Sequence, residues 1–348
     1  MKKSSTKKPN RSKYSVAVSS VGGGVGQSLI KALKLAGYRV VGLDADPLAA
    51  GLYAVDAAYI VPHVSHRSYL KEISRICHKE KCRLLFPGSD TELLILSKHR
   101  NLLEDSGGAV VVSSSKVIQL ADDKFETAQF LEKLELASPK TQILKDFIKK
   151  PEMLFPVVIK PKTGGSRSKN VFVMKDKSAL EKMLVTQKLE TENFVAQEYI
   201  DGEEYTCGTV SWNGECHGII VMSRVLRDGD TYKCFVKKNP VIEKAVRKVV
   251  EKLKPFGGCN VQLRLKGDVP YIFEINARSS GTTGARAIAG FNEPKMIADY
   301  ILFGTNPTFK IKEISILRYW KELVVPNKSI ERMKLMQSLQ KQSRISSL

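Results

Sequence analysis

The first third of the chain alternates short apolar runs with segments of helical periodicity. Apolar runs predict strands at 15–19, 39–43, 58–61, 83–86 and 109–113, and apolar positions three and four apart predict helices over 26–36, 66–79, 90–98 and 99–105. Strands that alternate with helices favour a parallel, doubly wound sheet. Ligands bind such sheets at the carboxyl ends of the strands, where Asp44 and the run PGSDTE at 87–92 stand.

A different pattern follows in the rest of the chain. The segment 122–136 predicts a helix, and a second helix starts at Pro240, with Asn239 as its cap and Gly257 after its end. Alternating strands lie between them, with a hairpin turn at Asn213–Gly214, and the strands CNVQLRLKG and VPYIFEINAR close this part. We therefore expect a second unit of mixed α+β structure.

The net charge of +20 bears on the choice of partner. Residues 1–13 and 327–348 carry about half of the excess, and basic end segments of this kind are commonly solvated. The remaining charge suits anionic ligands such as phosphates and carboxylates. The chain has no RNA-recognition signature and no zinc-finger spacing, so specific nucleic-acid binding is not expected. A protein without catalytic activity that binds a nucleotide, or that associates with nucleic acid through its basic tails, is an alternative that stays open.

The sequence indicates a cytoplasmic protein with no membrane partner. Its basic start lacks the apolar segment of a signal peptide, and no apolar run approaches the roughly 20 residues that span a bilayer. The six cysteines are scattered, without CxxC or paired-histidine spacing. This distribution favours reduced thiols over a zinc site or a disulfide framework.

The glycine cluster after the first strand has the layout of a dinucleotide-binding turn, with Asp44 about twenty residues further on. The GxGxxG fingerprint that begins at Gly22 has Gln27 in place of its third glycine, and the frame that begins at Gly24 has Leu29 there. The broken fingerprint makes an NAD-linked oxidoreductase the weaker reading. A tight strand-to-helix turn whose N–H groups touch a substrate is the simpler one.

Groups that suit a nucleoside triphosphate follow one another in the second unit. They are Lys124 and Lys160 for the phosphates, the loop 163–168 above them, Glu204 for the ribose, and the backbone near Glu198 and Ile200 for the adenine edge. Each of these features, taken alone, also has an explanation without nucleotide binding: a solvated lysine, a hairpin loop or an acidic strand end. Their order along the chain favours the nucleotide.

The segment FEINAR is the most specific indication of metal and phosphate chemistry in the sequence. Glu274 and Asn276 alternate along a strand and so project from one face, and Gln262 lies on the strand before. Three oxygen donors of this kind suit the hard ion Mg²⁺. Arg278 shares the face and suits the charge on a phosphoryl group in transfer. Because buried charges are costly unless paired or metal-bound, a purely structural role is the weaker reading.

Two segments are candidates to bind the carboxylates of substrates. They hold Arg224, Arg227 and Lys233 in SRVLRDGDTYK, and Ser280, Gly281 and Thr282 after the metal strand. A solvated basic hairpin is an equally good reading of the first.

Together, IKPKTGGS, QEYIDGEEYT and the VQ…FEINAR pair resemble the ATP-grasp superfamily, especially stand-alone enzymes similar to the large chain of carbamoyl-phosphate synthase. The likeness extends over 15–326. It implies a Rossmann-like pre-ATP-grasp domain at 14–115 and a two-lobed ATP-grasp domain at 116–326, with a mobile lid at 153–200. A disordered basic tail at 1–13 and a basic extension at 327–348 are expected to flank them.

The resemblance also implies roles for the matching residues. The phosphate grip comprises Lys124, Lys160, Lys162, Gly164, Gly165 and Ser166; Glu198 and Ile200 form the adenine linker, and Glu204 binds the ribose. The ligands of two Mg²⁺ ions, with Mn²⁺ as the alternative metal, are Gln262, Glu274 and Asn276, and the catalytic residues are Arg278 and Lys160. One departure is that the loop TGGSRSKN lacks the glycine that many relatives place after its serine–arginine pair.

The implied reaction is ATP-dependent ligation of a small-molecule carboxylate to an amine through an acyl phosphate, on amino acids or small peptides, with release of ADP and phosphate. The alternative is a carbamoyl-phosphate-synthase-like or carboxylase-type enzyme that uses bicarbonate. The lid is expected to close over ATP and exclude water. The identity of both substrates stays open, and a homodimer is one of the states open to the chain.

Overall fold

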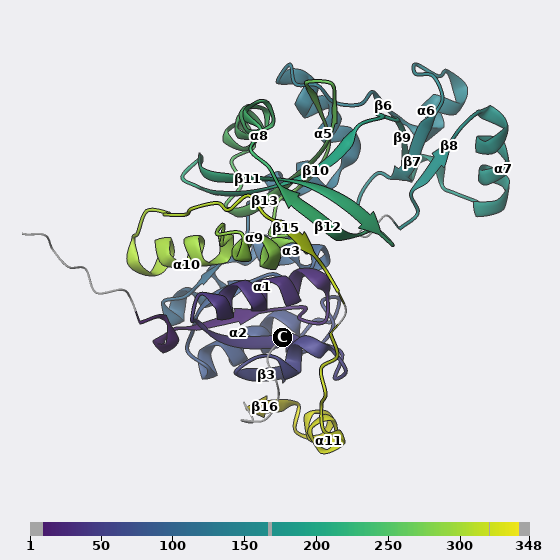
Figure 1. The fold of residues 1–348 in the computed structure, drawn as a ribbon. Coiled ribbons are helices and arrows are strands. Elements are labelled where there is room, and N and C mark those ends of the chain that lie inside the picture. Colours follow the sequence, from purple (N-terminus) through teal and green to yellow (C-terminus); the bar gives the residue numbers. More distant parts are fainter. Residues whose placement is uncertain (1–9, 166–168, 320, 341–348) are drawn as a thin grey trace, which may run out of the picture.

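Three sheets organise the part of the chain that the computed structural model describes, residues 10–165, 169–319 and 321–340. Figure 1 shows a parallel sheet at the bottom, a larger antiparallel sheet above it, and a small third sheet that projects at the upper right. The predicted fold class, a parallel sheet followed by a two-lobed α+β fold, is confirmed. Among the described residues, no helix has the length and apolar character needed to cross a bilayer.

The first sheet contains all five strands predicted from the apolar runs. They are β1 (Ser15–Val18), β2 (Arg39–Asp44), β3 (Ala57–Ile60), β4 (Cys82–Phe86) and β5 (Ala109–Val110), paired in parallel in the order β3-β2-β1-β4-β5. The helices α1 (Gly24–Leu35), α2 (Tyr69–Lys79) and α3 (Leu93–Lys98) pack around it. The strand residues are largely buried because the sheet is covered, as is usual for parallel sheets.

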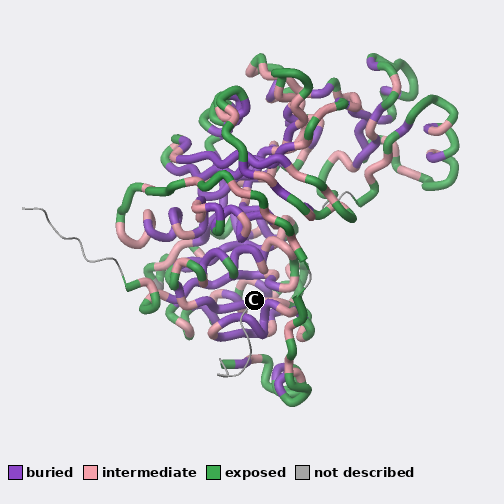
Figure 2. The backbone as a smooth tube through the Cα atoms, in the orientation of Figure 1, coloured by how far each residue is buried: buried purple, intermediate pink, exposed green. Residues whose placement is uncertain are grey.

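The middle sheet is antiparallel and includes the strand that carries the predicted metal ligands Glu274 and Asn276. Its order is β14 (Val269–Asn276), β13 (Gly257–Lys266), β10 (Glu203–Trp212), β11 (Glu215–Arg227), β12 (Asp230–Val236) and β15 (Ser315–Leu317). The predicted hairpin turn joins β10 to β11, with φ of 54° at Asn213 and 78° at Gly214, which is the left-handed backbone of a two-residue turn. Figure 2 shows that burial continues from this sheet into the first one.

Helices cover the middle sheet. α8 (Pro240–Leu253) begins as predicted, with the Asn239 side chain accepting from the Ile242 N–H, but it ends at a left-handed Lys254 rather than at Gly257, which starts β13. The short helices α9 (Thr283–Ile288) and α10 (Glu293–Phe303) lie between the middle and first sheets in Figure 1, where α9 packs on α1.

The third sheet has a small core of its own. Its order is β6 (Thr141–Ile143), β9 (Phe194–Glu198), β7 (Val157–Pro161) and β8 (Phe172–Met174), with α6 (Leu144–Lys149) and α7 (Lys177–Gln187) packed on it. The core residues, which include Phe147, Ile159 and Leu180, form a cluster separate from those of the other two sheets.

The segment predicted as one helix over 122–136 is part of two. α4 (Ser115–Asp122) ends where Asp123 adopts an extended conformation, and α5 (Lys124–Lys133) begins after it. The Asp123 side chain accepts hydrogen bonds from the backbone N–H groups of Phe125 and Glu126. A capping aspartate marks the start of a helix, so the predicted segment corresponds to α5, and only its first residue, Asp122, belongs to α4.

Both ends of the chain have more structure than the expected tails. Arg11 forms a bidentate ion pair with Asp299 of α10, with both N–O distances at 2.7 Å, so this part of the segment 1–13 is anchored. The C-terminal extension folds into α11 (Asn327–Met336) and β16 (Ser338–Gln340), and β16 adds antiparallel to the edge of β3. Residues 1–9 and 341–348 lie outside the described chain.

A buried ion pair fills the space between the middle sheet and α9. Arg286, 0% exposed, donates to Glu293 Oε1 at 2.8 Å and also donates to Thr206 and Asn260 of the sheet. Gly208 makes room for the pair, because a Cβ there would lie 2.3 Å from Arg286 Nη1 and from Glu293 Oε1. The pair ties α9 and the start of α10 to the strands that carry the candidate site.

We predict that Arg286→Met destabilises the protein by about 3–5 kcal/mol, because it leaves the Glu293 carboxylate buried and unpaired. The double variant Arg286→Met/Glu293→Met is expected to lose less than the single variant, since no charge is left behind. Urea unfolding followed by circular dichroism measures both. A single variant within about 1 kcal/mol of the wild type would contradict the prediction.

Candidate nucleotide and metal site

The candidate site lies where the third sheet meets the metal strand of the middle sheet. Lys160, near the end of β7, donates from Nζ to the Phe273 carbonyl of β14 at 3.2 Å and to Gln197 Oε1 of β9 at 2.8 Å. Phe273 immediately precedes Glu274. The ammonium predicted to hold a phosphate is therefore held against the strand predicted to hold the metal.

Burial changes the acidity of Lys160. The side chain is 7% exposed. Loss of hydration lowers its pKa to about 8, with Glu274 opposing and the ammonium of Lys124 reinforcing this shift. The group thus changes charge near neutral pH, unlike a solvated lysine.

Lys124 organises the glycine loop. It is the first residue of α5, and its ammonium donates to the Gly164 carbonyl and to the Asp122 carbonyl, the latter at 3.1 Å. The Asp122 carboxylate accepts the Gly164 N–H at 2.9 Å. Gly164 and Gly165 have φ of 66° and 81°, a conformation that favours glycine. Ser166, predicted to bind phosphate, lies outside the described residues.

Lys162 is oriented differently from the other two lysines. Its ammonium forms an ion pair with Asp123 Oδ2 at 3.3 Å, and its carbonyl accepts the Lys124 N–H at 2.8 Å. The residue therefore joins the loop to the start of α5.

The three predicted metal ligands lie on neighbouring strands. Gln262 of β13 is paired in register with Glu274 of β14, and Asn276 lies two residues further along the same strand. The Asn276 amide donates from Nδ2 to Glu274 Oε1 at 3.1 Å, which leaves its Oδ1 free of that contact. The structure thus brings these oxygens together on one face, as the alternation predicts.

Arg278, just after the metal strand, is bound to the first sheet. Its guanidinium makes a bidentate pair with Asp90, with Nε–Oδ1 and Nη2–Oδ2 distances of 2.8 Å each. Desolvation works against the charge of Arg278, but Asp90 and then Glu274 outweigh it and keep its pKa above the usual value. Asp90 is in the PGSDTE loop, whose position is fixed by the buried Glu92 carboxylate through the N–H groups of Gly88 and Ser89.

Glu204, the predicted ribose acid, is held between two arginines. Arg224 donates from Nε and Nη2 to Glu204 Oε1 at 2.9 and 2.6 Å, and Arg264 donates to Oε2 at 2.9 Å. Arg264 of β13 is paired in register with Glu204 of β10, and Arg224 of β11 lies next to Ser223, which pairs with Tyr205. Arg264 escaped the sequence analysis, although its place opposite Glu204 follows once the register is known.

Arg224 also reaches one of the predicted metal ligands, Gln262. Its Nη2 donates to Gln262 Oε1 at 2.6 Å, and its side chain is 11% exposed. Its reading as part of a solvated basic hairpin is therefore wrong. Lys233 is exposed beside the Tyr232 ring, which Arg227 also covers at 4.3 Å from its centroid.

Three protein-family models match parts of this chain, and two of them overlap over residues 190–245. Residues 16–111 match the PylC-like N-terminal domain, residues 121–245 match the RimK-like ATP-grasp domain, and residues 190–321 match the family described as ATP-grasp in the biosynthetic pathway with Ter operon. The chain contains an ATP-grasp domain.

The three individual proteins described next are similar to this ATP-grasp chain at 18–24% sequence identity. A carbamoyl-phosphate synthase of Methanobrevibacter smithii is 24% identical over 56% of this chain, and the match spans 56% of that relative's length. An L-amino acid ligase from Bacillus licheniformis has a TM-score of 0.65 at 18% identity, covering 83% of this chain and 74% of its own. The ADP complex of N5-carboxyaminoimidazole synthetase from Staphylococcus aureus gives 0.67 at 18% identity, with 86% and 80% covered.

The predicted adenine linker joins two sheets of the ATP-grasp fold. Glu198 ends β9, and its Oε2 accepts the Lys140 N–H at 3.2 Å. Ile200 is buried, and its carbonyl accepts from Arg264 Nη1 at 3.4 Å. The stretch between β9 and β10 thus runs from the third sheet to the middle sheet beside Glu204.

The predicted acceptor loop after the metal strand packs on the first sheet's glycine turn. Ser280 and Thr282 are buried and hydrogen-bond to each other at 2.7 Å, while the Gly281 carbonyl accepts from Ser28 Oγ at 2.6 Å. In the glycine turn itself, the Asp44 carboxylate accepts the Gly22 N–H at 2.7 Å, so this acid stabilises its own loop.

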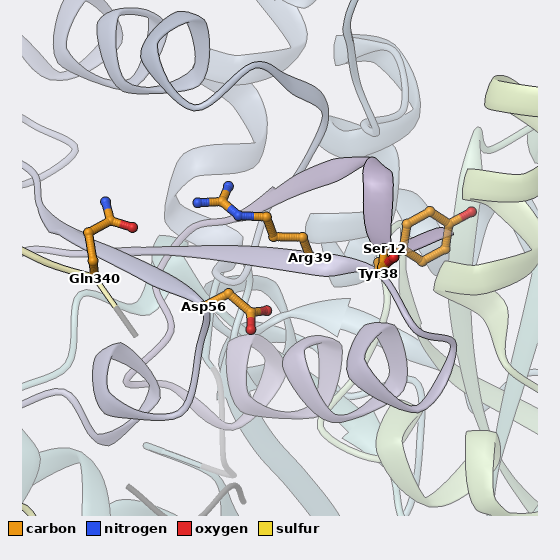
Figure 3. A pocket seen from close by; sticks show the side chains of 5 residues that line it. All are labelled: Ser12, Tyr38, Arg39, Asp56 and Gln340. Carbon is orange, nitrogen blue, oxygen red and sulfur yellow. The ribbon is translucent and has the colours of Figure 1, made fainter. Parts of the chain in front are cut away.

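A hollow elsewhere on the molecule is not part of this site. It is lined by Ser12, Tyr38, Arg39, Asp56 and Gln340 (Figure 3), which lie at the amino ends of the parallel strands. The candidate site lies beyond their carboxyl ends, the edge at which ligands of such sheets bind.

We predict that ATP binds this domain more weakly as the pH rises above about 8, because Lys160 loses its proton there. If the ammonium is required, the competent fraction at pH 9 is about one tenth, so the Kd rises about tenfold between pH 7 and 9. Lys160→Arg keeps its charge and should flatten this dependence. Titration calorimetry at several pH values measures it, and a wild-type Kd that does not change would refute the role of Lys160.

Proposed function

We propose that this chain is an ATP-dependent carboxylate–amine ligase. One observation carries the proposal: the ammonium of Lys160, from the third sheet, is bonded to the Phe273 carbonyl beside Glu274. Lys160, the proposed cation for the γ-phosphate, and Glu274, the proposed metal ligand, therefore lie near each other, on opposite sides of the boundary between the third and middle sheets. The named relatives differ in the products they make, so the comparisons support a reaction class. We propose amino acids or small peptides as the substrates.

The ligand set fits magnesium that arrives with a nucleotide. Glu274 is the single carboxylate of the set, and no group of three or more His, Cys, Asp or Glu in the described chain is arranged to hold a metal. Mg²⁺ is usually held by one or two carboxylates together with substrate phosphates and water. Gln262, Glu274 and Asn276 would hold two such ions, or Mn²⁺, and the metal would neutralise charge on the phosphoryl group in transfer.

The proposed reaction has two steps. A substrate carboxylate oxygen attacks the γ-phosphorus, the bond to the bridging oxygen of ADP breaks, and an acyl phosphate forms. The amine nitrogen then attacks the acyl carbon, phosphate leaves with the electron pair of the broken C–O bond, and the nitrogen loses a proton. Lys124, Lys160 and Arg278 lower the barrier by positioning and charge neutralisation rather than by acid–base chemistry.

The third sheet supplies the lid in this proposal. It has its own small core, and Lys160 and the glycine loop join it to the rest of the site. Residues 153–200 would move as a unit together with β6 and α6, which share the same sheet and core, so that ATP is admitted and water is then excluded, which protects the acyl phosphate from hydrolysis. We further propose action in the cytoplasm, which all six cysteines, free and buried, support.

A second candidate is a reaction in which bicarbonate replaces the organic acid. The similarity to a carbamoyl-phosphate synthase favours it. The same phosphate and metal residues would serve, because bicarbonate also presents a carboxylate oxygen to the γ-phosphorus. Bicarbonate-dependent ADP release in the absence of any amino acid distinguishes this reaction from ligation.

We predict that Glu274→Gln lowers ATP-dependent ADP release at least about a hundredfold while the protein stays folded, because the metal set loses its carboxylate. A coupled ADP assay with pooled amino acids and dipeptides measures turnover, and mass spectrometry identifies the product. The matched control is Glu251→Gln on α8, an exposed acid paired with Arg247. Near-normal ADP release from Glu274→Gln would overturn the proposal.

Asp90 is a positioning residue, and we predict that Asp90→Asn lowers kcat about ten- to a hundredfold with little change in the KM for ATP. The substitution removes the bidentate acceptor that orients Arg278 but touches none of the groups proposed to grip ATP. Steady-state kinetics separates the two constants. An equal rise in the KM for ATP would indicate a general structural defect instead.

A further inference from the structure

One arginine occupies atoms that the proposed nucleotide and the proposed metal both require. Arg224, on β11, donates from Nε and Nη2 to Glu204 Oε1 at 2.9 and 2.6 Å, and the same Nη2 donates to Gln262 Oε1 at 2.6 Å. Glu204 is the predicted ribose acid, and Gln262 is a predicted metal ligand. Because the strands lie in the order β13-β10-β11, the side chain of Arg224 reaches across β10 and bridges the two parts of the proposed site.

The two arginines use most of the acceptor capacity of Glu204. An ionised carboxylate has about four lone-pair positions. Arg224 takes two of them on Oε1, and Arg264 takes a third on Oε2 at 2.9 Å. About one position is left, whereas the two hydroxyls of a ribose need two. Glu204 can therefore accept both ribose hydroxyls only after one arginine has withdrawn.

A metal on Gln262 would act on one of these arginines. Mg²⁺ binds oxygen at about 2.0–2.1 Å, so an ion on Gln262 Oε1 would lie within about 5 Å of the Arg224 nitrogen that is 2.6 Å from this oxygen. The Arg224 side chain is only 11% exposed, and two charges of the same sign repel strongly at this distance in a partly buried site. Metal binding therefore favours withdrawal of Arg224, which also releases Glu204 Oε1.

Arg224 has another acceptor on the opposite side of its strand. Its Nη1 lies 3.5 Å from Thr231 Oγ1 of β12, which adjoins β11 on the side away from Gln262. Arg264 is held differently, because its Nη1 is bound at 3.4 Å to two backbone carbonyls of the linker between β9 and β10. These contacts identify Arg224 as the arginine that can move.

We propose that Arg224 couples recognition of the ribose to binding of the metal. Without metal, its guanidinium occupies both Glu204 and Gln262. With metal bound, it withdraws from both, and Glu204 accepts both ribose hydroxyls. This inference rests on the proposed function, in which ATP arrives with Mg²⁺, and deepens it, because the site then selects a metal-bound ribonucleotide over a free one. Arg224 is in this sense a specificity-determining residue.

The test separates this coupling from the direct bond between metal and phosphate. Titration calorimetry of the full chain measures the Kd of ADP and of 2′,3′-dideoxy-ADP, each with Mg²⁺ and with EDTA. Both nucleotides carry the same diphosphate, so the contribution of the phosphate–metal bond cancels in the ratio of their Kd values. We expect ADP to bind about tenfold more tightly than the dideoxy analogue with Mg²⁺, but only about twofold more tightly with EDTA.

Two variants assign the coupling to Arg224. Arg224→Met should give the same ratio with Mg²⁺ and with EDTA, because Glu204 Oε1 is then available under both conditions. Arg264 still pairs with Glu204 in this variant, so the carboxylate keeps a partner and the fold is retained. The matched control is Arg264→Met, which removes the other arginine from Glu204 and should keep the dependence of the ratio on metal.

A wild-type ratio that is the same with Mg²⁺ and with EDTA would overturn the inference, and so would a ratio that still depends on metal in Arg224→Met. The proposed function fails in a different way, if the folded wild type binds neither nucleotide under either condition, and that result overturns the inference as well. Because the titration requires no turnover, a loss of coupling is distinguishable from a loss of ligase activity.

Discussion

The bidentate pair between Arg278 and Asp90 holds the functional edges of the two main sheets together. The metal strand ends just before Arg278, and Asp90 lies in a loop at the carboxyl end of a parallel strand. Both groups lose hydration there, so the pair is stable only because its two N–H···O bonds are well formed. The contact fixes the predicted metal ligands relative to the first sheet, and the predicted acceptor loop packs on α1 across the same boundary.

The third sheet is attached more loosely than the other two. It has a separate core, and the polar contacts of Lys160 and Lys124 reach it from the metal strand and from α5. A unit with its own core can move without unfolding, and few contacts must break for it to do so. The contact that would close the lid is also the one that gives Lys160 its lowered pKa, because the approach of the lobes removes its water. In the proposed function, lid position and phosphate affinity would be coupled through this one side chain.

Local signals predicted the parts of the fold that depend on neighbours in sequence. The strands of the first sheet, the Asn213–Gly214 turn and the Asn239 cap each rest on residues a few positions apart. The start of the helix over 122–136 was predicted at Asp122, although Asp123 is the residue that caps α5. The strand β16 was missed because edge pairing with β3 depends on where a distant strand lies. Arg264 was missed because its role depends on the register of two strands.

The sequence by itself determined the alternation that forms each sheet and the placement of Glu274 and Asn276 on one face, because strand periodicity alone directs side chains. Gln262 joins them only through the register of β13 against β14. The tertiary structure alone decided which charges have partners. Arg278 and Asp90 are 188 positions apart, and no local pattern relates them. The same holds for the two arginines on Glu204, which lie 20 and 60 positions from it in the sequence. Pairing of charges depends on the packing of whole sheets, and that packing arises from contacts far apart along the chain.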